Sequence, residues 1–102
     1  MTQAQDPYRI EWRPKARDDL LAIAQELGTG DAESASGFGQ AVRDGMAKLA
    51  QQPCLGRVGR PGLPHGIREL AVWSDYLVFY RVCSDARAVE ILRIRQAARP
   101  AP

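Results

Sequence analysis

The sequence of 102 residues is poor in the residues that cross-link a fold or anchor it in a membrane. Its two cysteines, Cys54 and Cys83, lack the CxxC spacing of redox and metal sites, so we expect reduced thiols. No apolar run approaches the roughly 20 residues that span a bilayer, and the N-terminal MTQAQDPY lacks the basic and apolar regions of a secretion signal. The sequence therefore predicts a cytoplasmic protein without a membrane partner.

Groups that move protons or bind metals are also scarce. The single histidine, His65, lies between a proline and a glycine, which is typical of a solvated loop residue rather than a proton shuttle. No cluster of His, Cys, Asp or Glu has metal-ligand spacing, and no glycine pattern matches a phosphate-binding loop. We expect no catalytic residue, no metal and no cofactor.

Charge is present but unevenly distributed. Residues 1–52 carry six basic and eight acidic side chains, whereas residues 53–102 carry eight basic side chains, all arginine, and four acidic ones. The arginine fork favours bidentate contact with carboxylate or phosphate. The second half of the chain is therefore expected to meet an anionic partner.

The first half shows one strand pattern followed by two helix patterns. Residues 8–13 alternate apolar and charged side chains, as in a half-buried strand. Residues 14–28 repeat apolar side chains at helical spacing until Gly28 supplies a stop. A second helix is expected after a cap at Asp31 or Ser34. Its apolar stripe consists of Ala35, Phe38, Val42, Met46 and Leu49.

The second half changes to segments rich in β-branched and aromatic residues, which predict an antiparallel meander. These predicted strands are residues 67–73, 76–82 and 88–95. The resulting order β-α-α-β-β-β predicts a two-layer α+β fold, in which an N-terminal strand and a helical hairpin pack on a mostly antiparallel sheet. We expect one domain over residues 1–102, with flexible tails at 1–7 and 97–102.

Several other residues have structural interpretations. Asp18 and Asp19 fall in the first helical turns, where carboxylates interact favourably with the helix dipole. Trp12 and Trp73 lie within strand patterns and are expected to pack in the core. The glycines of the second helix, Gly45 among them, are expected to allow close backbone approach.

The arginines of the second half are the candidate contacts with a target. Arg57 and Arg60 lie in LGRVGRPGLPHGIREL, residues 55–70, where glycine and proline turns would present them at low entropic cost. Arg93 and Arg95 share a face of the last predicted strand. A merely solvated basic face is the alternative. The full set is Arg57, Arg60, Arg68, Arg81, Arg93, Arg95 and Arg99.

Five segments, in this order, resemble the RelE/ParE superfamily of toxins from type II toxin–antitoxin pairs, especially its ParE branch. The segments are IEWRPKARDDLLAIA at 10–24, LAQQPCLGR at 49–57, GIREL at 66–70, YLVFYRV at 76–82 and VEILRIRQAAR at 89–99. The resemblance implies a RelE/ParE-like fold and a toxin that a ParD-like antitoxin neutralises in a hetero-oligomer. It makes apolar residues of the helices and of one strand candidates for antitoxin binding, namely Leu20, Ile23, Leu27, Phe38 and Trp73.

The superfamily implies two mechanisms. RelE-like members cut mRNA on the ribosome, whereas characterised ParE-like members poison DNA gyrase without being nucleases. Where the ribonuclease branch commonly has basic, histidine or tyrosine side chains, this chain has Leu70, Leu77, Gln96 and Ala97. Leucine and alanine neither move a proton nor stabilise developing charge. We expect a gyrase inhibitor, with an mRNA endoribonuclease or a non-toxic antitoxin-binding module as alternatives.

Overall fold

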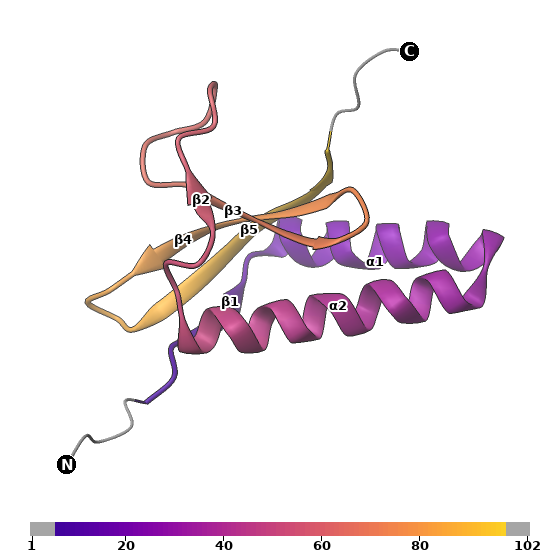
Figure 1. Ribbon diagram of the computed structural model, residues 1–102, viewed down its shortest axis with the longest axis horizontal. Coiled ribbons are helices and arrows are strands. Elements are labelled where there is room, and N and C mark those ends of the chain that lie inside the picture. Colours follow the sequence, from indigo (N-terminus) through magenta and orange to yellow (C-terminus); the bar gives the residue numbers. More distant parts are fainter. Residues whose placement is uncertain (1–5, 98–102) are drawn as a thin grey trace.

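The computed structural model describes residues 6–97, which form a five-stranded sheet and two helices (Figure 1). The elements follow the expected order, with one additional short strand. They are β1 (Arg9–Trp12), α1 (Pro14–Gly30), α2 (Ala32–Gln51), β2 (Arg57–Val58), β3 (Arg68–Trp73), β4 (Tyr76–Cys83) and β5 (Ala88–Gln96).

The helical hairpin turns at a single residue, Asp31. Its backbone N–H donates to Leu27 O at 2.9 Å and ends α1, while its carboxylate accepts from Glu33 N at 3.0 Å and begins α2. Of the two predicted candidates for this cap, Asp31 and Ser34, the structure shows Asp31. The predicted stop at Gly28 is wrong by two residues, because α1 continues to Gly30.

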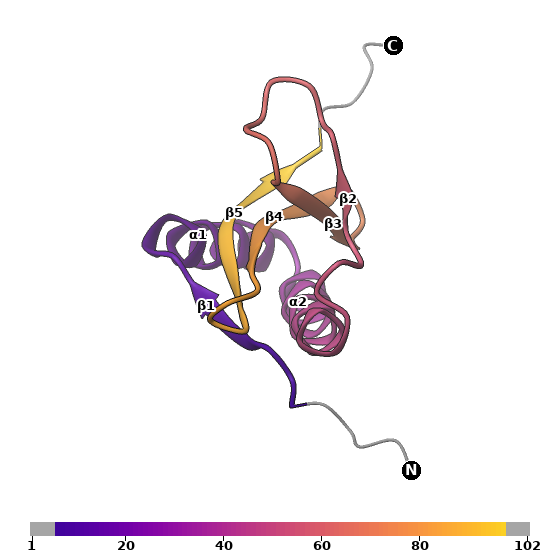
Figure 2. The same ribbon diagram turned by 90° about the vertical axis from the view of Figure 1, so that its left-hand side faces the viewer.

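The sheet has the order β1-β5-β4-β3-β2, with β1 parallel to β5 and every other pair antiparallel. Both helices cover the same face of this sheet (Figure 2), which confirms the expected α+β architecture. The strand β2 was not predicted, since its two residues are too few to show alternation and they lie among turn-forming glycines and prolines. We call the sheet surface turned away from the helices the open face.

A bulge in β5 decides which of its side chains reach the open face. The pairing passes from Tyr80 opposite Ile91 to Phe79 opposite Arg93, so Leu92 is the extra residue. Ile91 and Ile94, three positions apart, are consequently both buried beneath the helices. Without the extra residue, strict alternation would direct Arg93 into the core.

The core joins α2 to the central strands. Phe38 and Leu49 of α2 are fully buried, as are Val78 and Tyr80 of β4. A β-carbon added at Gly45 would lie 3.0 Å from Val72 Cγ1, which confirms that this glycine permits close approach of α2 to β3. Burial of these side chains provides the main stabilisation of the two layers.

Both tryptophans pack against the core, as their strand patterns predicted. Trp12 is half-buried, and Trp73 meets Phe38 edge-on with ring centroids 6.2 Å apart. Both cysteines are free, and no helix in the described part of the chain is long and apolar enough to cross a membrane. Most of the two predicted tails, residues 1–5 and 98–102, lies outside the described residues.

Candidate functional site

The open face carries rows of side chains that run across the strands, and two neighbouring rows hold exposed arginines. Residues directly opposite each other in neighbouring strands point to the same side of a sheet. The register therefore aligns Arg57, Glu69, Phe79 and Arg93 in one row. A second row holds Ala71, Leu77 and Arg95. An apolar centre, with Phe79 and Leu77 half-buried, thus lies between arginines.

Arg93 is fixed by an acidic residue of α1. Its Nε donates to Asp19 Oδ2 at 2.7 Å and its Nη2 to Oδ1 at 3.1 Å, while Ile94 N donates to Oδ2 at 2.9 Å. Burial alone would raise the pKa of Asp19, but these hydrogen bonds outweigh it and hold that pKa below its ordinary value. Asp19 therefore joins α1 to the edge of β5 beyond the end of β1. The helix-dipole interpretation of Asp19 is wrong, since no acidic residue lies in the first turn of α1.

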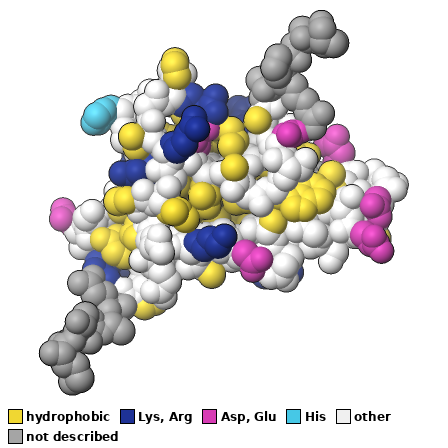
Figure 3. Space-filling model, in the orientation of Figure 1, with side chains coloured by type: hydrophobic (Ala, Val, Ile, Leu, Met, Phe, Trp, Pro, Cys, Tyr) yellow, Lys and Arg dark blue, Asp and Glu magenta, His cyan; other side chains and the backbone are white. Residues whose placement is uncertain are grey.

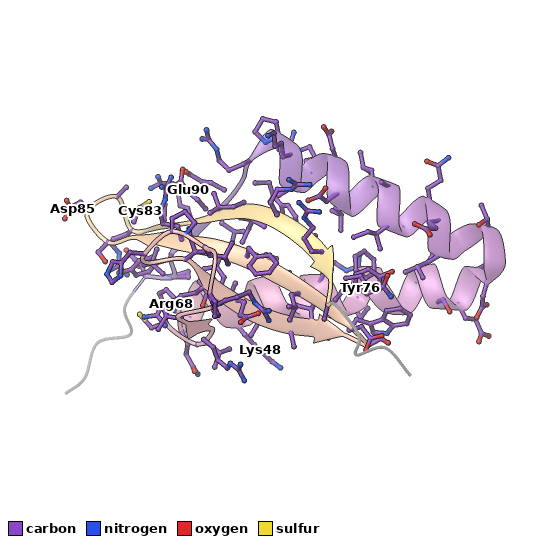
Figure 4. All side chains as sticks on the ribbon, turned by 90° about the horizontal axis from the view of Figure 1, so that it is seen from above. Lys48, Arg68, Tyr76, Cys83, Asp85 and Glu90 are labelled. Atoms are coloured by element: carbon purple, nitrogen blue, oxygen red, sulfur yellow. The ribbon has the colours of Figure 1, made fainter. Side chains whose placement is uncertain are left out.

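Arg81 is paired at another end of the sheet. Its Nε and Nη2 donate to Glu90 Oε1 at 2.9 and 2.6 Å, and Arg13 Nη1 lies 3.6 Å from Oε2 of the same carboxylate. The hydrogen bonds from Arg81 and the Cys83 thiol lower the pKa of Glu90 and raise those of both donors. Figure 4 shows Cys83 and Glu90 close together at one end of the sheet and Tyr76 at the other. A thiol with a raised pKa is a poor nucleophile at neutral pH.

Arg60 is held by the carboxylate of Glu69, the one buried charged residue among those described. Arg60 Nε and Nη2 donate to Glu69 Oε2 at 2.9 and 2.6 Å. This pair ties the loop between β2 and β3 to the row that also contains Phe79. Figure 3 shows Lys and Arg side chains gathered where that loop meets the sheet, and acidic side chains gathered toward the far end of the helices.

Arg68 lies apart from the open-face arginines. It stands opposite Tyr80, and its Nη1 donates to the carbonyls of Cys54 and Gly56 at 3.1 and 2.8 Å. The Tyr80 hydroxyl accepts from Gly56 N at 2.7 Å and donates to Pro53 O at 2.8 Å. Burial raises the pKa of Tyr80 despite the hydrogen bond from Gly56. Arg68 and Tyr80 together hold the link from α2 to β2.

The seven candidate arginines therefore divide by location. Within residues 6–97, no carboxylate lies within ion-pair distance of Arg57 or Arg95, which are both exposed on the open face. Arg93 belongs to the same face but is paired, and Arg60 and Arg81 are paired nearby. Arg99 lies outside the described residues.

The antitoxin candidates lie on the helical side. Leu20, Ile23 and Leu27 of α1 are half-buried against the core, as is Trp73. Phe38 exposes no surface in this structure, although it lines an apolar groove between the helices from beneath. Helical spacing indicated the face of Phe38 but not its depth, and its part in antitoxin binding stays a prediction.

An apolar groove of about 540 Å³ lies between the helices near β1. Leu21, whose side chain is 63% exposed, lines it beside Leu20 and Trp12. Sequence reasoning missed Leu21 because it falls beside the apolar stripe of α1. The only signal was the second leucine of the Leu20-Leu21 pair, placed where a solvated residue was expected.

The two rows that hold Arg57, Arg93 and Arg95 offer contacts around an apolar centre. Arg93 and Arg95 stand opposite Phe79 and Leu77, and neither of those side chains can give or accept a proton. The carboxylate in the same row, Glu69, is engaged by Arg60. Among the described residues, no three His, Cys, Asp or Glu side chains are grouped as a metal site would require. Fixed guanidinium groups around an apolar centre suit binding to an acidic surface.

Comparison with known proteins agrees with this architecture. No curated protein sequence matches the chain. Among solved structures, a toxin–antitoxin ParDE system from P. aeruginosa is 27% identical with a TM-score of 0.72, covering 89% of this chain and 97% of its own. The RelBE2 complex from Mycobacterium tuberculosis is 24% identical with a TM-score of 0.59, covering 88% and 98%. The intact E. coli RelBE complex is 17% identical with a TM-score of 0.58, covering 90% and 99%.

A family model agrees with the first of these structures. The model described as the ParE toxin of the type II toxin–antitoxin system parDE matches residues 10–100, which include both helices, β2 to β5 and all of β1 except Arg9. The chain therefore belongs to the ParE toxin family.

Proposed function

We propose that this ParE-family toxin inhibits DNA gyrase by binding it through the open face, and that a cognate ParD-like antitoxin neutralises the toxin. Membership of the family supports the toxin role, and the ParDE system from P. aeruginosa supports the choice of an antitoxin partner. The gyrase target follows from the ParE-like resemblance of the sequence.

One observation carries the choice of binding over cleavage. The arginines of the open face surround Phe79 and Leu77, whereas phosphodiester cleavage requires a group that activates the nucleophile and one that protonates the leaving oxygen. The described open-face acids are already paired, Glu69 with Arg60, Glu90 with Arg81 and Glu11 with Arg9. Such a surface gains affinity from charge complementarity at its rim and from burial of its apolar centre.

The antitoxin is assigned to the helical side for a separate reason. The groove that Leu20 and Leu21 line is predominantly apolar, and an amphipathic partner helix buries its apolar face in grooves of this kind. Of the candidate residues, Leu20 and Phe38 line this groove, whereas Ile23, Leu27 and Trp73 lie outside it, packed against the core. This arrangement leaves the open face for the target.

The test compares two activities of the purified protein. We expect it to inhibit supercoiling of relaxed plasmid by gyrase, or to trap cleaved DNA, and to leave ribosome-bound mRNA intact. Cleavage of that mRNA, abolished by Arg68→Ala, would establish the endoribonuclease alternative and contradict our proposal. Expression that harms no cell in the absence of an antitoxin would instead support a non-toxic antitoxin-binding module.

A further inference from the structure

Exposed large apolar side chains are concentrated in one stretch of the chain. In the part of the molecule that the structure describes, four such side chains are exposed, namely Leu21, Leu55, Val58 and Leu63. Three of them lie within residues 55–63, and Val58 and Leu63 are 56% and 39% exposed. We call residues 58–67, which run from the end of β2 to the start of β3, the finger. It rises from the sheet on the side away from both helices (Figures 1 and 2).

The finger is held in one conformation by its own chemistry. Gly59, Gly62 and Gly66 have φ angles of 91°, 87° and 89°, which other residues rarely adopt. Backbone hydrogen bonds run from Leu63 N to Arg60 O at 3.3 Å and from Ile67 N to Pro64 O at 3.4 Å. Two prolines further reduce the freedom of the unfolded segment. A loop built in this way loses little entropy when it binds.

The base of the finger is tied to the sheet by side chains. Arg60 reaches the carboxylate of Glu69 through two hydrogen bonds, and Arg68 reaches the carbonyl of Gly56 at 2.8 Å. The hydrogen bonds of both arginines therefore hold the loop and its base in place. The exposed apolar side chains, rather than Arg60, are left to face a partner.

The charge and shape of the finger restrict what that partner can be. Residues 55–68 contain three arginines and no acidic residue. The finger curves around a hollow of about 590 Å³ that Val58, Leu63, His65 and Arg68 help to line. An apolar wall with cationic groups beside it fits an apolar side chain and a neighbouring carboxylate from another protein. Exposed aliphatic side chains gain little from contact with a sugar–phosphate backbone. The surface therefore suits a protein partner better than a nucleic acid.

We propose that the finger is a preformed docking element that places Val58 and Leu63 against an acidic-rimmed apolar site on the target protein. Naming gyrase as that target rests on the function proposed above. The contact is separate from that of the open face, because Val58 stands opposite Arg68 and its side chain therefore lies on the other side of the sheet from Arg57. Exposed apolar side chains grouped on a rigid support mark a site of protein–protein interaction.

The test compares charged substitutions on the finger with charged substitutions on the helices. The double variant Val58→Asp/Leu63→Asp changes exposed side chains and should fold, which circular dichroism and thermal unfolding verify. We expect it to raise the concentration of toxin needed for half-inhibition of gyrase by about tenfold or more, because buried aliphatic contacts are replaced by charges facing an acidic rim. The matched control, Gln25→Asp/Ser36→Asp, places two such charges at exposed positions of α1 and α2 and should inhibit gyrase as the unmodified protein does.

The following outcomes support or overturn the docking proposal. Equal inhibition by the folded double variant and the unmodified protein would overturn the proposal. So would binding of the unmodified toxin to linear DNA without gyrase, if the double variant abolishes that binding. If the unmodified protein fails to inhibit gyrase, the gyrase assignment is wrong, and growth arrest of expressing cells becomes the readout. Loss of arrest in the double variant alone then supports the finger, whereas arrest in both, or in neither, overturns it.

Discussion

Asp19 of α1 forms a bidentate ion pair with Arg93 of β5, 74 residues away. Arg93 Nε lies 2.7 Å from Asp19 Oδ2, and Arg93 Nη2 lies 3.1 Å from Oδ1. The same carboxylate oxygen accepts the backbone N–H of Ile94 at 2.9 Å. One side chain therefore closes the free edge of β5 and holds an arginine of the open face. The pair links the helical layer to the surface that we assign to the target.

Removing this carboxylate should destabilise the fold. We expect Asp19→Ala to lower the free energy of unfolding by about 1–3 kcal/mol, because Arg93 and the N–H of Ile94 both lose their acceptor in a part-buried position. Urea unfolding followed by circular dichroism measures the change. The control is Asp18→Ala, which removes an exposed carboxylate one residue earlier and should change stability by less than about 0.5 kcal/mol. Equal effects of the two substitutions would contradict the assignment.

The protein should also become less stable in acid, because two of its carboxyl groups have lowered pKa values. The pKa values of Asp19 and Glu90 lie below their ordinary values of 3.8 and 4.5, so the folded state binds these protons less readily than the unfolded state. Their stabilisation is fully present above the ordinary values and is lost as the pH falls through the lowered ones. The unfolding free energy should therefore decrease below about pH 4.5.

A variant isolates this contribution. Asp19→Asn/Glu90→Gln removes both titrating groups, and its unfolding free energy should depend less steeply on pH between about 5 and 3 than that of the unmodified protein. Urea unfolding at several pH values gives both slopes. Parallel curves for the two proteins would show that other carboxyl groups cause the acid sensitivity.

Much of the fold could be predicted from local patterns, because these depend on neighbours in the sequence. Alternation over residues 8–13 and the spacing of Phe38 and Val42 predicted β1 and α2, and Asp31 was one of two candidate caps. The bulge at Leu92 could not be predicted, since an extra residue exists only relative to the partner strand.

The candidate site was less predictable for the same physical reason. Composition drew attention to the arginines, but their partners are distant in sequence, as Arg93 and Asp19 illustrate. Pattern alone treats Arg68 and Arg95 alike, whereas the fold turns Arg68 to the backbone of Gly56 and leaves Arg95 exposed. Only the three-dimensional pairing separates structural arginines from those available to a target.

A close approach at Gly56 gives a further prediction. A β-carbon there would lie 2.6 Å from the Tyr80 hydroxyl and 2.7 Å from the carbonyl oxygen of Glu69, and Tyr80 is fully buried. Gly56→Ala should therefore lower the melting temperature and cost about 1–3 kcal/mol, since backbone and core must both shift. Gly30→Ala serves as the control, because nothing lies within 4 Å of the added carbon. Equal melting temperatures for the two variants would contradict this packing.

The open face predicts different consequences for its two neighbouring arginines. Arg95→Ala removes an exposed guanidinium that has no carboxylate within ion-pair distance among the described residues, so stability should not change. Arg93→Ala leaves Asp19 without its partner and should cost about 1–3 kcal/mol of stability. If the open face contacts gyrase, Arg95→Ala should still weaken inhibition of supercoiling by about tenfold.

Arg17→Ala is the control for charge, because Arg17 is exposed on α1, on the helical side of the sheet. It removes one positive charge, as Arg95→Ala does, but should leave inhibition unchanged. Inhibition by the unmodified toxin should also weaken as salt rises from about 50 to 200 mM, since exposed guanidinium groups are screened. Equal loss of inhibition in Arg17→Ala and Arg95→Ala would indicate a dependence on net charge. A local contact at the open face instead requires that Arg95→Ala alone lose inhibition and show the smaller salt dependence.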